Sequence, residues 1–177
     1  MLTVLGALAL LMPFAVIGPA YVWHTVPERV ALNAIGTPVQ ARFARAWERG
    51  VELRGWQGEG QANSGQAYEL RLVWHALEKI PKGWTVFVHL VAADETIVAK
   101  SDRKPLDGVF PFTYWIGGDW IIDPIRLDLP QSLAPGTYEL RVGLFDAKRG
   151  DRHTIRDEQG DAIADYVTIG TMQIIHP

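Results

Sequence analysis

The chain has 177 residues, with 17 Lys and Arg against 20 Asp and Glu, so its formal net charge is −3. This length suits one folded domain with a small appendage rather than two domains. The basic residues are scattered singly, which excludes the clustered basic face of a nucleic-acid-binding protein. The chain has no cysteine, so disulfides and thiolate metal sites are also excluded, whereas the cellular compartment is left open.

The first 23 residues contain no charged side chain and are mostly aliphatic. As a helix that rises about 1.5 Å per residue, they would cross the roughly 30 Å of a bilayer's hydrocarbon core. A cleaved signal peptide would have a charged start and a shorter apolar run, so we expect a retained transmembrane helix at 1–23. The expected membrane-anchor residues, with the last two in an aromatic belt at the exit, are Leu8, Leu11, Pro13, Phe14, Tyr21 and Trp23.

Residues 24–50 lose any simple pattern and are expected to form a linker or edge segment between the membrane and the domain. Val39, Phe43 and Trp47 recur every four residues, as on one face of a short helix. Val39, Ala41 and Phe43 also fit a strand, so two interpretations stay open here. The basic residues that follow the apolar segment would place the domain in the cytoplasm if the positive-inside rule acted alone.

After residue 50 the apolar residues recur at every second position, which is the period of a strand with one buried face. The run Trp84 to Ala92 is apolar at both parities, so we expect a central strand, buried on both faces or flanked by strands on both sides. Pro124 marks its own strand as an edge strand or a bulge. The expected strands are 51–56, 68–74, 84–92, 95–100, 119–129, 137–145 and 162–175.

Seven or eight short strands joined by turns, with no soluble helix, predict an all-β antiparallel β-sandwich over residues 51–177. Residues 146–161 are polar and are expected to form an exposed hairpin loop. In the closing segment the expected apolar side consists of Ile163, Tyr166, Val167, Ile169, Met172 and Ile174.

The long connection from Ser101 to Gly118 contains two prolines, three glycines and four aromatic residues, and it is too apolar for a free loop. If its aromatic side chains are exposed, they form a contact surface for a protein, a lipid headgroup or a glycan. Alternatively, half of them close one end of the sandwich as core. The candidate binding residues, which include two polar neighbours, are Phe110, Phe112, Tyr114, Trp115, Trp120, Asp102 and Arg103.

The sequence contains no motif for catalysis, a metal or a cofactor. The five histidines lack the spacing of zinc ligands, and neither a nucleophile elbow nor a phosphate loop occurs. We therefore expect no enzyme activity, no catalytic residue, no metal and no cofactor. Four acidic residues could together bind calcium, but they show no calcium-loop motif, and Asp in turns commonly caps its own backbone: Asp102, Asp107, Asp119 and Asp123.

Several strings, in this order, resemble one family: VFVHL at 86–90, SDRKPLDG at 101–108, Phe110-Pro111, Trp115, Gly118-Asp119, Asp123, and PGTYELRVGLFD at 135–146. They are similar to the extracytoplasmic β-sandwich at the C-terminus of bacterial integral-membrane glycosyltransferases of the dolichyl-phosphate-mannose mannosyltransferase type. The apolar segment ending in GPAY at 18–21 resembles the last membrane span of those enzymes. The resemblance implies an edge strand before residue 50 and a sandwich outside the cytoplasmic membrane.

Those enzymes catalyse in a core of many membrane spans, for which this chain has no room, so no catalytic residue carries over. We therefore expect a single-pass protein of the bacterial cytoplasmic membrane with an extracytoplasmic sandwich. Its expected function is that of a non-catalytic subunit that contacts other integral-membrane proteins. The alternative is an accessory module of a membrane glycosyltransferase that binds a glycan or a lipid-linked sugar.

Overall fold

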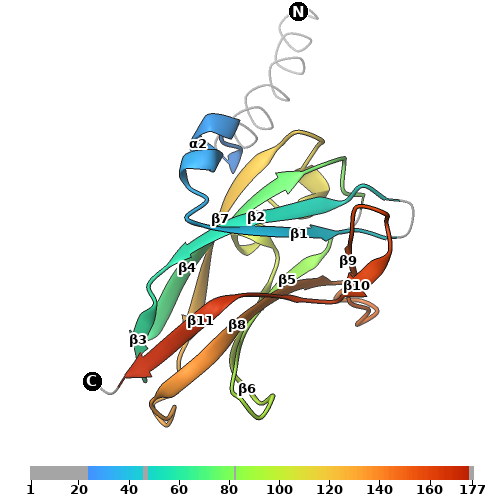
Figure 1. Ribbon diagram of the computed structural model, residues 1–177. Coiled ribbons are helices and arrows are strands. Elements are labelled where there is room, and N and C mark those ends of the chain that lie inside the picture. Colours follow the sequence, from blue (N-terminus) through green and yellow to red (C-terminus); the bar gives the residue numbers. More distant parts are fainter. Residues whose placement is uncertain (1–23, 46–47, 82, 176–177) are drawn as a thin grey trace, which may run out of the picture.

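The computed structural model describes residues 24–45, 48–81 and 83–175, which form two packed sheets (Figure 1). One sheet has six strands in the order β10-β9-β1-β2-β4-β7, and the other has five in the order β3-β11-β8-β5-β6. The expected all-β sandwich is therefore confirmed. The strands are β1 (Thr37–Phe43), β2 (Val51–Gly58), β3 (Gln61–Asn63), β4 (Ala67–Ala76), β5 (Thr85–Val91), β6 (Ile97–Arg103), β7 (Trp120–Asp128), β8 (Gly136–Phe145), β9 (Ile155–Arg156), β10 (Ala162–Ala164) and β11 (Val167–Ile175).

The long strands lie where the two-residue period predicts them. In β8, Tyr138 and Leu140 are buried between less buried neighbours. The neighbouring strands pair antiparallel, except that β3 pairs with β11 in parallel. β7 is an edge strand with a neighbouring strand, β4, on one side only. A proline is tolerated there because no strand on the other side needs its missing backbone N–H as a donor.

The central strand β5 lies between β6 and β8, and all seven of its residues are buried. Val86, Val88 and Leu90 point into the main core. On the opposite face, the Phe87 ring lies over Gly143 of β8, where a methyl group would overlap both this ring and the Asp165 carbonyl. Both features expected of this strand, burial and flanking strands, are present.

Residues 24–50 differ from the expected linker because they are docked on the sandwich. The helix α2 (Glu28–Asn33) packs through Ala31 on Val73 and Trp120, on the outer face of the six-stranded sheet. The backbone N–H of Val26 donates to the Trp120 carbonyl at 2.9 Å. β1 lies between β2 and β9, so it is an interior strand and not an edge.

Two expectations for the end of the chain were wrong in detail. Residues 146–161 are not simply an exposed loop, because β9 lies within them and pairs with β1, which buries Ile155 in the core. Ile163 does not face inward: it lies on β10, at the end of the six-stranded sheet, and is 63% exposed. The other expected residues of β11, Val167, Ile169, Met172 and Ile174, do pack in or against the core. Tyr166, just before β11, is half-buried against the Arg141 guanidinium.

No helix within the described ranges is long and apolar enough to cross a membrane. The transmembrane helix expected at 1–23, with its anchor residues Leu8, Leu11, Pro13, Phe14, Tyr21 and Trp23, lies outside these ranges.

Candidate functional site

The aromatic residues of the 105–119 segment are mostly buried. Two 3-10 turns, η1 (Pro105–Gly108) and η2 (Phe112–Tyr114), fold this segment over one end of the sandwich. The Phe112 ring lies 6.1 Å from Trp74 of β4, 5.8 Å from Trp84 before β5 and 4.4 Å from Trp115, measured between centroids. It thus joins the two sheets. We call Phe110, Phe112 and Trp115, together with Trp74 and Trp84, the aromatic plug.

Burial of the plug removes most of the predicted aromatic binding surface. The side chains of Phe110, Phe112 and Trp115 are each at most 1% exposed. The Trp115 indole N–H donates to the Phe110 carbonyl at 3.0 Å. Trp120 is buried under α2, where His75 stacks on its ring at 4.3 Å. Of the five aromatic candidates, Tyr114 is the exposed one, at 58%. The alternative interpretation, that such residues close the end of the sandwich as core, describes Phe110, Phe112 and Trp115, whereas Trp120 is buried separately under α2.

Asp102 and Arg103 are adjacent in β6 but face opposite sides, so they do not form one site. Asp102 accepts from His89 at 3.0 Å and pairs with Lys100 at 3.2 Å on the outer face of the five-stranded sheet. Burial lowers the pKa of His89, and the Asp102 carboxylate opposes this shift in part. Arg103 instead reaches β7, the edge of the other sheet.

Arg103 ties the two sheets together at this edge. Its guanidinium donates to Asp123 at 3.0 Å, and also to the Pro124 carbonyl and to Asp107. The same Asp123 oxygen accepts from the backbone N–H of Leu106 at 2.9 Å, which helps to hold η1. Asp123 is completely buried, and burial raises its pKa to about 6 despite the opposing charge of Arg103.

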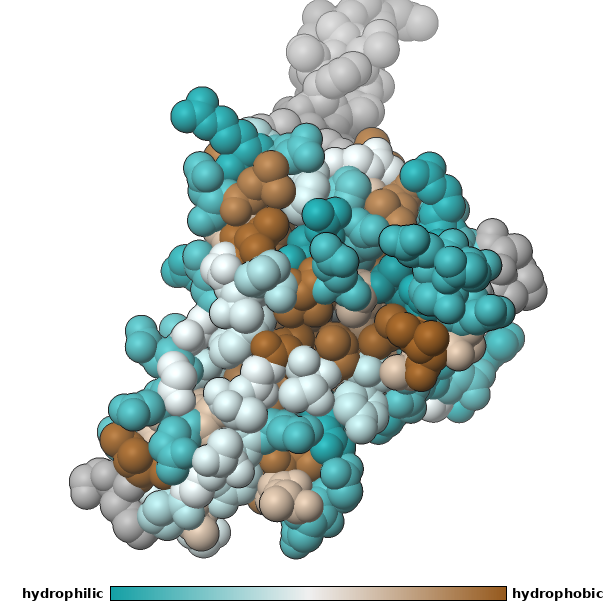
Figure 2. Space-filling view, viewed as in Figure 1, coloured by the Kyte–Doolittle hydropathy of each residue, from teal (hydrophilic) through white to brown (hydrophobic). Residues whose placement is uncertain are grey.

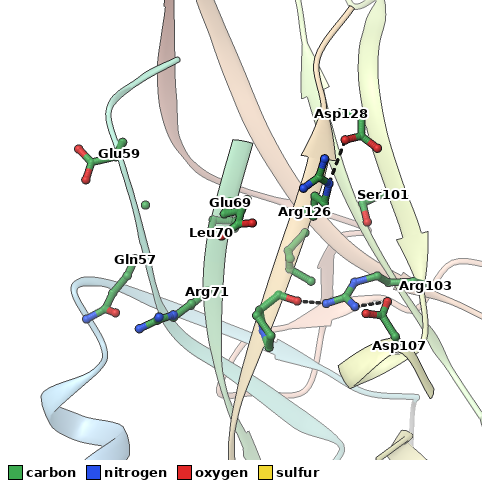
Figure 3. Close-up of a pocket in the computed structure, with 13 residues that line it drawn as sticks. Gln57, Glu59, Glu69, Leu70, Arg71, Ser101, Arg103, Asp107, Arg126 and Asp128 are labelled. Carbon is green, nitrogen blue, oxygen red and sulfur yellow. Dashed lines mark hydrogen bonds and ion pairs between the residues drawn. The ribbon is translucent and has the colours of Figure 1, made fainter. Parts of the chain in front are cut away.

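Beside Arg103 an open groove of about 820 Å³ runs along the outer face of the six-stranded sheet (Figure 3). We call it the polar groove. Its walls come from the end of β2, the outward side chains of β4 and β7, and the β6–η1 junction. It is lined by Gln57, Gly58, Glu59, Glu69, Leu70, Arg71, Ser101, Arg103, Asp107, Pro124, Ile125, Arg126 and Asp128.

Strand alternation brings the charges of the groove together. Glu69 lies opposite Arg126, and Arg71 opposite Pro124, across the β4–β7 ladder. Arg126 donates to Asp128 at 3.0 Å (Figure 3), and both side chains are largely exposed. Within the described part of the chain, Arg71 has neither a hydrogen bond nor an ion pair from its guanidinium. Its five donors are therefore available to a ligand.

Glu59, which lines the groove just after β2, is tied to Tyr68, a core residue of β4. The Tyr68 hydroxyl donates to the Glu59 carbonyl at 2.7 Å. Burial, with the nearby Glu59 charge, raises the pKa of Tyr68 to about 12. Tyr68 is thus a neutral, structural hydroxyl at physiological pH and not a proton donor or acceptor for chemistry.

The polar groove presents charged groups of both signs. Its carboxylates and guanidiniums lie on an open surface, and no nucleophile–base pair lines it. Among the described residues there is no group of three or more His, Asp or Glu that could hold a metal ion. None of the aromatic residues that the structure describes lines the groove.

Sequence reasoning missed Arg71 and Arg126 as candidates because each looks like an ordinary outward residue of an alternating strand. Pro124 indicates an edge strand, and this was one signal that could have marked the two arginines. A second signal was the acidic residue Glu69, which lies opposite Arg126. Neither signal predicts the order of strands that places β2, β4 and β7 side by side.

No family model and no curated protein matches the chain. Solved structures that resemble it include the C-terminal domain of Wzt, at 11% identity over 86% of this chain and 88% of that one, with a TM-score of 0.48. A CARDB domain from Pyrococcus furiosus has 8% identity over 69% and 90% of the two chains, with a TM-score of 0.38. A Niemann-Pick type C2 protein from the Japanese carpenter ant has 8% identity over 78% and 95%, also with 0.38. These are distant similarities of β-sandwich architecture, and they assign no family.

Proposed function

We propose that this chain is a membrane-anchored, non-catalytic subunit whose sandwich binds another membrane protein through the polar groove. Residues 1–23 supply the anchor, and the sandwich stands on the extracytoplasmic side of a bacterial cytoplasmic membrane. The observation that carries the proposal is the combination of an unpaired Arg71 with exposed charges of both signs in one groove. Arginine is enriched at the energetic centres of protein interfaces.

The pattern of charge favours a protein partner over a sugar. Carboxylates of Glu59, Glu69 and Asp128 alternate with the guanidiniums of Arg71 and Arg126 along the groove. Complementary charges of this kind give a protein interface its register and its specificity. A sugar-binding groove is expected to offer a flat aromatic face. Four of the five aromatic candidates of this chain are buried in the plug or under α2, and the exposed one, Tyr114, does not line the groove.

The alternative function, an accessory module that binds a glycan or a lipid-linked sugar, is supported by the resemblance to mannosyltransferase-type enzymes. The hydrogen-bonding groups of the groove, including Ser101 and Gln57, would suit sugar hydroxyls. The aromatic face that a sugar ring would stack on is absent from the described lining of the groove.

Site-specific photo-crosslinking in native membranes would test the proposal. A benzophenone side chain replaces Glu69 in the groove or, as the matched control, Arg149 in the exposed turn after β8. We expect a discrete protein adduct from position 69 only, and its yield should fall several-fold when Arg71→Glu is added. An adduct of equal yield from both positions would contradict the proposal, and a glycan or lipid-sugar adduct from position 69 would favour the alternative.

A further inference from the structure

An uncharged surface lies at the end of the sandwich that the aromatic plug closes. The sequence from Gly108 to Gly118 contains no charged residue. Although most of its aromatic side chains are buried, three apolar side chains point to the surface: Val109 is 61% exposed, Tyr114 58% and Ile116 45%. We call Val109, Tyr114 and Ile116 the apolar tip.

The apolar tip is held on a fixed base. Tyr114 packs edge-on against Phe110, with ring centroids 5.9 Å apart. The neighbouring Trp115 is fully buried, and the Ile116 N–H donates to the Asp119 carboxylate at 2.8 Å. The three side chains are therefore displayed by the fold and are not free to withdraw into the core.

The uncharged N-terminal segment reaches the sandwich at the same end. The His24 ring lies 5.4 Å from the Phe110 ring, and Val26 is hydrogen-bonded to Trp120. No charged residue precedes Glu28. Figure 1 shows α2 at the end opposite the C-terminus, and Figure 2 shows apolar surface over α2 at this end. Two uncharged stretches, residues 24–27 and 108–118, thus meet here.

The charges around the tip also suit a lipid surface. Lys104 lies beside Gly108, and Lys79 follows Glu78, whose backbone packs on Gly117. Neither lysine has a hydrogen bond or an ion pair within the described ranges. The nearby acids are engaged: Asp107 with Arg103, and Glu78 with the Gly50 N–H. Free cations next to exposed apolar residues and a tyrosine match the headgroup boundary of an anionic bilayer.

We propose that the apolar tip rests in the interfacial region of the bilayer that holds residues 1–23, so the sandwich stands on the membrane with a defined orientation. The inference rests on the proposed function, because it requires the N-terminal segment to be in the membrane. β7 leads away from the tip, and the six residue steps from Trp120 to Arg126 span about 20 Å at the rise of an extended strand. The polar groove then faces sideways, above the headgroups, toward a neighbouring membrane protein.

The absence of cysteine allows a direct test with nitroxide labels on single introduced cysteines. The full chain would be placed in vesicles of phosphatidylethanolamine and phosphatidylglycerol, and the collision rates of each label with oxygen and with a water-soluble nickel chelate would be measured. The test variants are Val109→Cys, Tyr114→Cys and Ile116→Cys. The matched controls are Ile163→Cys, at 63% exposure, and Ile97→Cys, at 46%, each of which lies in a strand away from the tip.

We expect the oxygen-to-nickel ratio at the three tip positions to exceed that at both controls several-fold. Ratios equal to those of the controls would overturn the inference. So would labels at the tip that are shielded from both reagents, because that result would mean that a protein covers the tip. Circular dichroism of each variant would verify that the fold is retained.

A label at Leu11→Cys separates this inference from the proposed function. A lipid-like ratio at position 11 with water-like ratios at the tip would overturn only the membrane contact of the sandwich. A water-like ratio at position 11 would overturn the anchor, and with it both proposals.

Discussion

The aromatic plug and the polar groove lie near opposite ends of β7, and they use their side chains in opposite ways. At the start of β7 the aromatic residues are buried and join the two sheets. Toward its end, Arg126 and Asp128 stand in solvent. The difference teaches that enrichment in a residue type is weak evidence for a site. Tryptophan is the enriched type here, but the groups available to a partner are arginines and carboxylates.

The largest expected effect comes from removing a member of the plug. Trp115→Ala should lower the free energy of unfolding by about 3–5 kcal/mol, because a fully buried indole leaves a cavity and a lost hydrogen bond. Its neighbour Tyr114 is exposed, so Tyr114→Ala should cost well under half as much. Urea denaturation followed by fluorescence would measure both. Equal losses for the two variants would remove the distinction between the plug and the tip.

A second comparison can be made within the groove itself. Arg103→Ala should lower the free energy of unfolding by about 3 kcal/mol, because it leaves the buried Asp123 without its cation. Arg126→Ala should change it by less than about 0.5 kcal/mol, since the pair with Asp128 is exposed. Thermal denaturation of the two variants side by side would check this. A neutral Arg103→Ala would mean that the arginine is not needed to join the sheet edges.

The smallest effect concerns pH. Burial raises the pKa of Asp123 to about 6, so between about pH 4 and pH 6 the folded chain binds a proton that the unfolded chain has lost. This contribution to stability is complete below about pH 4 and is lost as the pH rises through about 6. The Asp123→Asn variant lacks this pH-dependent contribution because its side chain does not titrate. The unfolding free energy of the wild type, minus that of the variant, should therefore fall by about 2 kcal/mol between about pH 4.5 and pH 7.5.

The comparison with one variant cancels other titrating groups, such as His89, which are present in both proteins. Denaturant titrations at several pH values would provide the measurement. A difference that stays flat across this range would show that Asp123 remains ionised in the folded chain and that its ion pair outweighs its burial.

The sequence predicts the long strands of this fold well because most of them have one buried face, which alternation reports, while the central strand is continuously apolar because both of its faces are buried. β4, β5, β7 and β8 lie within a few residues of their expected bounds. The short strands β3, β9 and β10 could not be predicted, since two or three residues carry no period. Their pairing depends on segments far away, as when β9 reaches β1.

The candidate site was less predictable because exposure is a property of the fold and not of the residue. Phe112 and Tyr114 are two positions apart and have the same aromatic character, yet one is completely buried and the other is mostly exposed. Asp102 and Arg103 are adjacent, and strand alternation sends them to different sides. Arg71 could become a candidate only once the order of strands placed Pro124 and Gln57, and no acid, opposite it.

The contact of Phe87 with Gly143 has a consequence for the history of this sequence. The ring occupies the space of the missing side chain on the outer face of β8, so neither position can change freely while the other is kept. Among relatives, a larger residue at 143 should appear together with a smaller one at 87, and the two positions should vary as a pair. Such covariation would serve as a signature of this sandwich where overall identity has become too low to recognise it.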